Sequence, residues 1–291
     1  MELHAQRGFS LVEMVIVITL IGILASVLAN IIRGPMQSLI VVQERSRLVD
    51  MLDTALVRMS REIRLALPYS IRVSGTNAIE FLRTLDGGRY REQAAGRLDF
   101  GVASSTFTVL NTLDNPANIQ TGTASTGCLN GTADCLVVYN IGQPTTVAAA
   151  TSGGTSANAY LGTNVNFEGN IATISAALAN SLSFNNSDVA GWSFGVTSPN
   201  QRFHIVDTPV SFVCSGSAIT RYSGYAIQET QPAPPGSGGN LLVDNVTSCS
   251  FSFDPPTMTR FGLLTLQIEV TQPNSGESVS LIQQIHVSNI P

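Results

Sequence analysis

A nearly continuous apolar run from Met14 to Ile32 is the feature that most limits how this chain can fold. As a helix, a run of this length can cross the hydrocarbon core of a bilayer, and a helix satisfies its own backbone polar groups there. One carboxylate, that of Glu13, stands directly before the run. An acidic side chain inside a bilayer costs about 2.5 to 3.5 kcal/mol, so Glu13 calls for a functional explanation that includes a partner.

The residues in front of the run provide such an explanation. A polar leader, residues 1–8, ends at Gly8, and Phe9, Ser10, Leu11, Val12 and Glu13 follow it. This segment resembles the processing signature of type IV prepilins and pseudopilins. The resemblance implies cleavage after Gly8 by a prepilin peptidase and N-methylation of Phe9. It also implies that Glu13 is an assembly residue, whose partner is the new amino terminus at Phe9 of this or a neighbouring subunit.

Two alternative interpretations of the N-terminus differ in processing. An ordinary secretory signal would use Arg7 as its charged region and Val27–Ala29 as its cleavage site, but its apolar region usually has only about 7 to 15 residues and no acid. A plain single-span anchor would keep the leader. The distribution of positive charge does not separate these alternatives, because Arg7 precedes the span and Arg33 follows it.

A second apolar pattern continues the helix beyond the span. Apolar residues recur at three- and four-residue spacing on one face: Leu48, Leu52, Ala55, Met59, Ile63 and Ala66. This spacing predicts a helix over residues 9–67, ended by Pro68. Gly22 and the Gly34–Pro35 pair are the expected bends or breaks. The apolar face is expected to dock on the chain's own β domain rather than to form an intermolecular seam.

Residues 68–291 show short strand patterns separated by turn residues, which predicts one β-rich domain and an α+β fold class. Asp86, Gly87 and Gly88 are expected to form a hairpin turn between strands at 78–85 and 89–92. A long terminal hairpin is expected from Gly262–Thr271 and Ser278–Val287. Other strand candidates are 106–110, 135–140, 181–184, 192–196, 202–206, 210–214, 240–243 and 248–253. Residues 148–158 and 231–239 are expected to be surface insertions without regular structure.

Four cysteines lie in the part of the chain expected outside the cytoplasm, where disulfides persist. Three pairings are possible. We favour Cys128–Cys135, which closes a small loop, and Cys214–Cys249, which staples two strands across the 231–239 insertion. A zinc site is the alternative, but the usual close cysteine spacing is missing and the only histidines after residue 8 are His204 and His286.

Charge and motifs argue against several function classes. The chain has no lysine, and residues 98–291 contain 3 arginines against 11 acids, whereas residues 1–97 contain 12 arginines against 9 acids. An acidic distal domain has no basic stripe for a phosphate backbone, so nucleic-acid binding is not expected. No phosphate-binding loop, nucleophile elbow or EF-hand spacing is present. We therefore expect neither catalytic residues nor a cofactor or metal, and we interpret His204 as a strand residue rather than a base.

More distal motifs narrow the resemblance. The segments Arg61–Pro68, Ser70–Val73, Arg221–Tyr225 and Leu241–Phe253 are similar to the MshO-type minor pilins of mannose-sensitive haemagglutinin (MSHA) pili, to PilW-type minor pilins and, more distantly, to J-type type II secretion pseudopilins. The resemblance implies a type IV pilin-like fold: a membrane-spanning N-terminal helix packed on an antiparallel sheet domain with insertions. It also implies a single-pass inner-membrane protein with a periplasmic domain, which assembles with major and minor pilins and can reach the pilus tip.

Three functions remain open on this evidence. The first is a minor pilin-like subunit in the initiating or tip complex of an MSHA-type pilus. The second is a pseudopilin of a type II secretion system. The third belongs to another class, a membrane-anchored protein whose β domain binds a surface or ligand directly.

Overall fold

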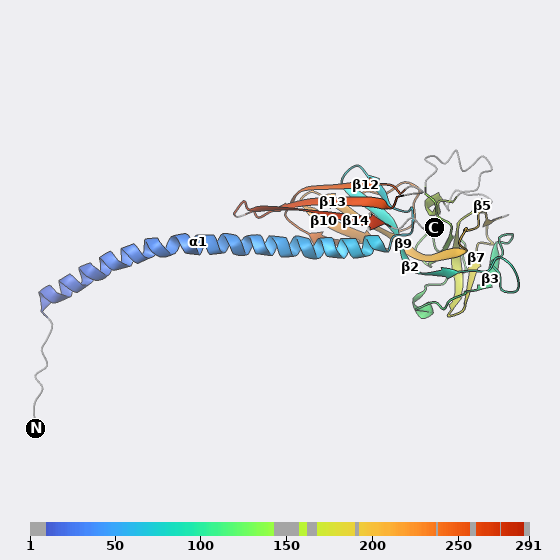
Figure 1. Cartoon of the computed structure of the whole chain (residues 1–291), viewed down its shortest axis with the longest axis horizontal. Helices are drawn as coiled ribbons and strands as arrows, with labels where there is room; N and C mark the ends of the chain where they lie inside the picture. Colours follow the sequence, from blue (N-terminus) through green and yellow to red (C-terminus); the bar gives the residue numbers. More distant parts are fainter. Residues whose placement is uncertain are drawn as a thin grey trace, which may run out of the picture.

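The computed structural model describes residues 10–142, 157–161, 168–189, 192–236, 238–256, 260–273 and 275–287, without the side chains of residues 33, 34, 37 and 168. One long helix, α1 (Leu11–Arg64), leads into a β-rich domain (Figure 1). The strands are β1 (Arg72–Ser74), β2 (Ala78–Arg89), β3 (Ser104–Thr108), β4 (Cys135–Val138), β5 (Glu168–Gly169), β6 (Ile171–Leu178), β7 (Ser181–Asn185), β8 (Ser193–Phe194), β9 (Arg202–Ser215), β10 (Ala218–Ser223), β11 (Gly239–Val243), β12 (Val246–Asp254), β13 (Gly262–Thr271) and β14 (Ser278–Val287). Two short 3-10 turns, η1 (Pro116–Asn118) and η2 (Ala159–Leu161), complete the described elements. The expected α+β class with a long N-terminal helix and an antiparallel domain is confirmed.

Helix α1 has 54 residues and is continuous, which corresponds to a length of about 80 Å. Gly22 and the Gly34–Pro35 pair were expected to bend or break the helix; neither breaks it, and Pro35 lies inside it. Proline removes one backbone donor, which a helix can absorb by bending. Figure 1 shows a gentle curve along the N-terminal half of α1 and a straighter course beyond it.

The C-terminal half of α1 supplies the first core. Its predicted apolar face is buried together with residues of both larger sheets: Leu48, Leu52, Ala55, Met59, Ile63 and Ala66 pack with Phe81, Phe212, Leu264, Leu266 and Ile285. The helix lies mainly along β14 and also touches β2, β11 and β13. The expectation that this face docks on the chain's own domain is confirmed. Burial of each large apolar side chain contributes about 1.5 to 3 kcal/mol.

Two sheets share this core. A three-stranded antiparallel sheet has the order β12-β13-β14. Its β13–β14 hairpin pairs Gly262 with Val287 through Thr271 with Ser278, which confirms the expected terminal hairpin. Among the described residues, the larger sheet has nine strands, in the order β1-β2-β9-β4-β6-β7-β3, with β10 and β11 branching from β9.

The long strands β2 and β9 run from the α1 core into a second lobe (Figure 1). This distal lobe contains β3, β4, β6 and β7, and its core includes Phe107, Phe184, Trp192, Phe194 and Phe203. It lies at the opposite end of the molecule from the start of α1 (Figure 1).

The expected hairpin at Asp86–Gly88 is wrong, because β2 runs through these residues without a turn. Gly87 and Gly88 pair with His204 and Phe203 on β9. A Cβ atom at Gly87 would lie 2.9 Å from the Phe203 carbonyl oxygen, and one at Gly88 would lie 2.9 Å from the Phe203 ring. The glycines therefore serve a close approach of two strands, which is the other common reason for glycine inside a strand.

The two expected insertions have different outcomes. Residues 148–156 of the first lie outside the described residues, but its last residues, Ala157 and Asn158, are buried. The Asn140 side chain accepts from the backbone N–H of Ala159, just beyond them. This end of the segment is therefore not a surface loop. The described part of 231–239 has no helix or strand before Gly239, where β11 begins.

Candidate functional site: the assembly helix and its anchor

The start of α1 carries the expected assembly residue. Ser10 is the N-cap of the helix, and its Oγ accepts a hydrogen bond from the Glu13 backbone N–H at 3.2 Å. A cap of this kind satisfies one of the free N–H groups at a helix start. The role of Ser10 was missed, although the Ser-x-x-Glu spacing that signals such a cap is visible in the sequence. Gly8 and Phe9, the expected cleavage and methylation residues, lie outside the described residues.

Glu13 lies at the beginning of a helix segment that packs against no other part of the described chain. Residues Leu11–Ile32 are apolar and long enough to cross a membrane, and none of them is buried in the chain. At about 1.5 Å per residue, these 22 residues extend about 33 Å, close to the thickness of a bilayer core. Side chains this apolar are stable only against lipid or other protein. The segment therefore fits single-pass membrane anchoring.

The other end of α1 is fixed to the β domain by an ion pair. The Arg221 Nε on β10 donates to both carboxylate oxygens of Glu62, at 2.7 and 3.0 Å. The Arg221 Nη1 also donates to Ser223 Oγ at 2.8 Å. Both charged side chains are largely buried, and a charge-assisted contact of this kind is stronger than an exposed pair. Glu62 is thus an anchor of the helix rather than part of its solvent-exposed face.

A second polar anchor lies just after the helix. The Arg72 side chain donates to Glu80 Oε1 from Nε at 2.9 Å and from Nη2 at 2.5 Å. The Tyr225 hydroxyl donates to Glu80 Oε2 at 2.9 Å, and the Arg72 guanidinium lies 3.7 Å from the centre of the Tyr160 ring. Burial raises the pKa of the Glu80 carboxyl, while Arg72 opposes that rise. The remaining donors of Arg72 bind the carbonyl oxygens of Gln228 and Glu229, which fixes the loop before 231–239.

These two anchors unite segments that are far apart in sequence. Glu62 and Arg72 come from the helix end and the strand after it, whereas Arg221 and Tyr225 come from β10 and the loop after it. The same segments carry the distal part of the resemblance described above. The Glu62–Arg221 pair therefore holds the end of α1 to β10, whereas the Arg72 cluster joins β1, β2 and the loop after β10.

Both favoured cysteine pairs are adjacent in space. The structure joins Cys128 to Cys135 with a Cα–Cα distance of 5.0 Å. It joins Cys214 to Cys249 with a Cα–Cα distance of 6.5 Å. The second bridge links β9 of the large sheet to β12 of the three-stranded sheet.

The histidine that was weighed as a base is a strand residue. His204 lies in β9 as expected, and burial together with Arg202 lowers the pKa of its imidazole to about 4. Over the described ranges, no three His, Cys, Asp or Glu side chains gather as they would around a metal ion. The arrangement found is that of an exposed apolar helix segment whose other end is held to the β domain by polar contacts.

Comparison with known families agrees with this arrangement. Residues 3–29 match the model of the prokaryotic N-terminal methylation motif. The matched residues include Gly8, Phe9, Glu13 and most of the apolar span. Searches of curated proteins and of solved structures gave no match. The motif supports a type IV pilin-like or pseudopilin subunit, which is a structural rather than an enzymatic role.

Proposed function

We propose that this protein is a minor pilin-like subunit that enters the initiating or tip complex of a type IV pilus of the MSHA type. Before assembly, a prepilin peptidase cleaves it after Gly8 and the new N-terminal Phe9 is methylated. In this proposal residues 1–8 are the leader, residues 9–67 contain the membrane-spanning and assembly helix, and residues 68–291 form the periplasmic domain.

The uncovered segment Leu11–Ile32 is the observation that carries the proposal. It is joined without a break to the docked half of α1, so a force on the N-terminal segment passes directly to the β domain. Glu62 and Arg221 hold the far end of the helix in place. A helix that is exposed at one end and fixed at the other can pack among the helices of other subunits. The β domain then stays outside the membrane.

Glu13 is the residue through which the proposal can be tested. Leaving water is costly for an isolated charge, so a carboxylate in the span needs a partner such as the Phe9 ammonium of this or another subunit. Replacing Glu13 by Val or Gln removes the charge and leaves insertion unchanged or improved. The loss should appear in assembly alone.

The experiment is co-purification of Glu13→Val and Glu13→Gln proteins with the other pilins, together with their membrane level and cleavage state. We expect correctly cleaved, membrane-inserted protein that no longer enters the complex. Asp50→Asn is the matched control, because Asp50 is an exposed acid of the same helix outside the span. Normal complex formation by cleaved Glu13→Val protein would contradict the proposed role. Co-purification of the unaltered protein with secretion pseudopilins alone would assign it to a type II secretion system instead of a pilus.

A further inference from the structure

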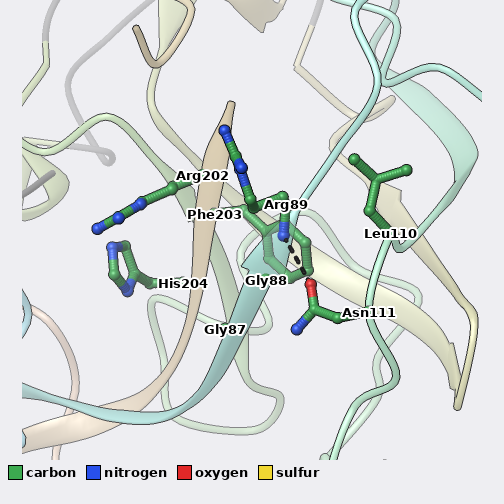
Figure 2. A pocket seen from close by; sticks show the side chains of 8 residues that line it. All are labelled: Gly87, Gly88, Arg89, Leu110, Asn111, Arg202, Phe203 and His204. Carbon is green, nitrogen blue, oxygen red and sulfur yellow. Dashed lines mark hydrogen bonds between the residues drawn. The ribbon is translucent and has the colours of Figure 1, made fainter. Parts of the chain in front are cut away.

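A pocket of about 510 Å³ lies where the end of β2 meets the start of β9 (Figure 2). In the antiparallel register Arg89 is opposite Arg202, and Gly87 is opposite His204. Directly opposite residues of an antiparallel pair point to the same face, as do residues two apart along a strand. Arg89, Arg202 and His204 therefore share one face, and Figure 2 shows the Arg202 guanidinium beside the His204 ring.

The opposite face of this strand pair is closed. Phe203 is buried there and packs edge-on against Phe107, with ring centroids 5.4 Å apart. Gly87 carries no side chain, and a Cβ atom at that position would lie 3.5 Å from His204 Nδ1. The space beside His204 thus stays open, and exposed Leu110 forms an apolar part of the lining.

Arg89 and Arg202, which carry the same charge, lie directly opposite each other on neighbouring strands. Like charges directly opposite on neighbouring strands are destabilising. Within the described part of the chain, no carboxylate forms an ion pair with either guanidinium, and Arg89 Nε donates to the Asn200 carbonyl oxygen at 3.0 Å. Asp86, three residues before Arg89, accepts instead from the backbone N–H groups of Gly87 and Asp114. Arg202 is also one of only three arginines in the acidic segment 98–291.

We propose that this pocket binds the carboxylate or sulfate group of an organic ligand about the size of one sugar ring, with Arg89 and Arg202 as the anion contacts. Guanidinium groups match the geometry of such oxyanions, often with two parallel hydrogen bonds. The volume falls in the range of small-molecule sites and exceeds what a lone ion needs. The site goes beyond the assembly role, because it lies in the distal lobe, away from the exposed part of α1 (Figure 1).

The test uses the full chain in detergent micelles and isothermal titration with sodium glucuronate, sodium sulfate and neutral glucose at constant ionic strength. We expect saturable one-to-one binding of glucuronate, weaker binding of sulfate and none of glucose. Arg89→Gln and Arg202→Gln should each weaken glucuronate binding about tenfold or more, the usual effect of losing a charge-assisted contact. Arg97→Gln is the matched control, since Arg97 pairs with Asp99 outside the pocket lining.

A further variant tests the pocket even if the arginine variants misfold. Leu110→Asp places a carboxylate at the pocket on an exposed residue, so it should fold and yet lose glucuronate binding. Absence of saturable glucuronate binding by the unaltered protein would overturn the proposal. So would binding that persists in both arginine variants, or an equal loss in Arg97→Gln, which would indicate a response to net charge alone. Binding of sulfate without binding of glucuronate would contradict the proposal that the ligand is organic.

Discussion

Asp134 is a residue at which burial and charge are in conflict. Its side chain is 4% exposed, and its Oδ2 accepts from the Gln120 backbone N–H at 2.8 Å. Burial raises the pKa of the carboxyl from 3.8 to about 6, and the Asp207 charge adds to the rise, while the Gln120 N–H and Arg83 oppose it. The folded state therefore holds the Asp134 proton more tightly than the unfolded state does between about pH 4 and 6. The unfolding free energy contributed by Asp134 falls as pH rises through that window.

His204 works in the opposite direction over nearly the same range. Its pKa is lowered to about 4 by burial and by Arg202, so the unfolded state binds the extra proton between about pH 4 and 6.5. The unfolding free energy contributed by His204 therefore rises with pH. The two opposing contributions partly cancel in the unaltered protein, so a single variant must be compared with it.

We predict that Asp134→Asn stabilises the protein near pH 7 and leaves it unchanged near pH 4. Asparagine keeps an acceptor for the Gln120 N–H and cannot ionise. The difference in unfolding free energy should grow from near zero to on the order of 2 to 3 kcal/mol across this range, since the pKa rises from 3.8 to about 6 and each unit corresponds to about 1.4 kcal/mol. Urea denaturation at pH 4 to 7 measures it, with Asp50→Asn as an exposed control. A difference that does not change with pH would show that Asp134 titrates normally.

Among the secondary-structure elements, those with local patterns were predictable. The β13–β14 hairpin has apolar alternation along most of two strands of equal length, and its predicted bounds match the structure. Strand β6 was missed because alanine, which is unfavourable in strands, fills three of its eight positions. Strand β9 was predicted as two strands, since Pro209 interrupts the pattern. In the structure Pro209 sits next to a register shift, a place where a sheet tolerates proline.

The link between the two sheets gives a prediction for the disulfides. Peptide mapping without reduction should join Cys128 to Cys135 and Cys214 to Cys249. Replacing Cys214 and Cys249 by Ala should lower the unfolding free energy by about 3 to 4 kcal/mol, because the bridge closes a loop with a sequence separation of 35. The Cys128–Cys135 pair, with a separation of 7, should contribute less, about 2 kcal/mol. Guanidinium denaturation of the two double variants compares them, and a larger loss from the shorter loop would refute the loop-length explanation.

For the molecule as a whole, the sequence singles out the N-terminal motif but not the polar contacts that hold the end of α1. Gly8, Phe9 and Glu13 follow one another within a few residues, so a local motif was enough to single them out. The Glu62–Arg221 pair joins residues 159 apart, and Arg72 with Glu80 is completed by Tyr225, which is 145 residues from Glu80. Contacts of this kind depend on the tertiary fold, and no spacing rule indicates them.

The proposed oxyanion pocket likewise depends on contacts that no local motif indicates. His204 was expected in a strand, but Arg89 and Arg202 become neighbours only through the register of β2 on β9. That register was hidden by the mistaken hairpin at Gly87 and Gly88. A single misassigned turn therefore concealed both the pairing of β2 with β9 and the pocket built on it.

The mass of the mature N-terminus decides whether this chain is processed as a pilin-like subunit. In cells that contain a prepilin peptidase, mass spectrometry of the membrane-extracted protein should find a chain that starts at N-methylated Phe9. Gly8→Leu should retain the full leader, because the peptidase must approach the backbone closely at this bond, while Gly22→Leu, a change within the same helix, should be processed normally. A mature protein that starts at Asn30, or one that keeps Met1 in the presence of the peptidase, would contradict the account.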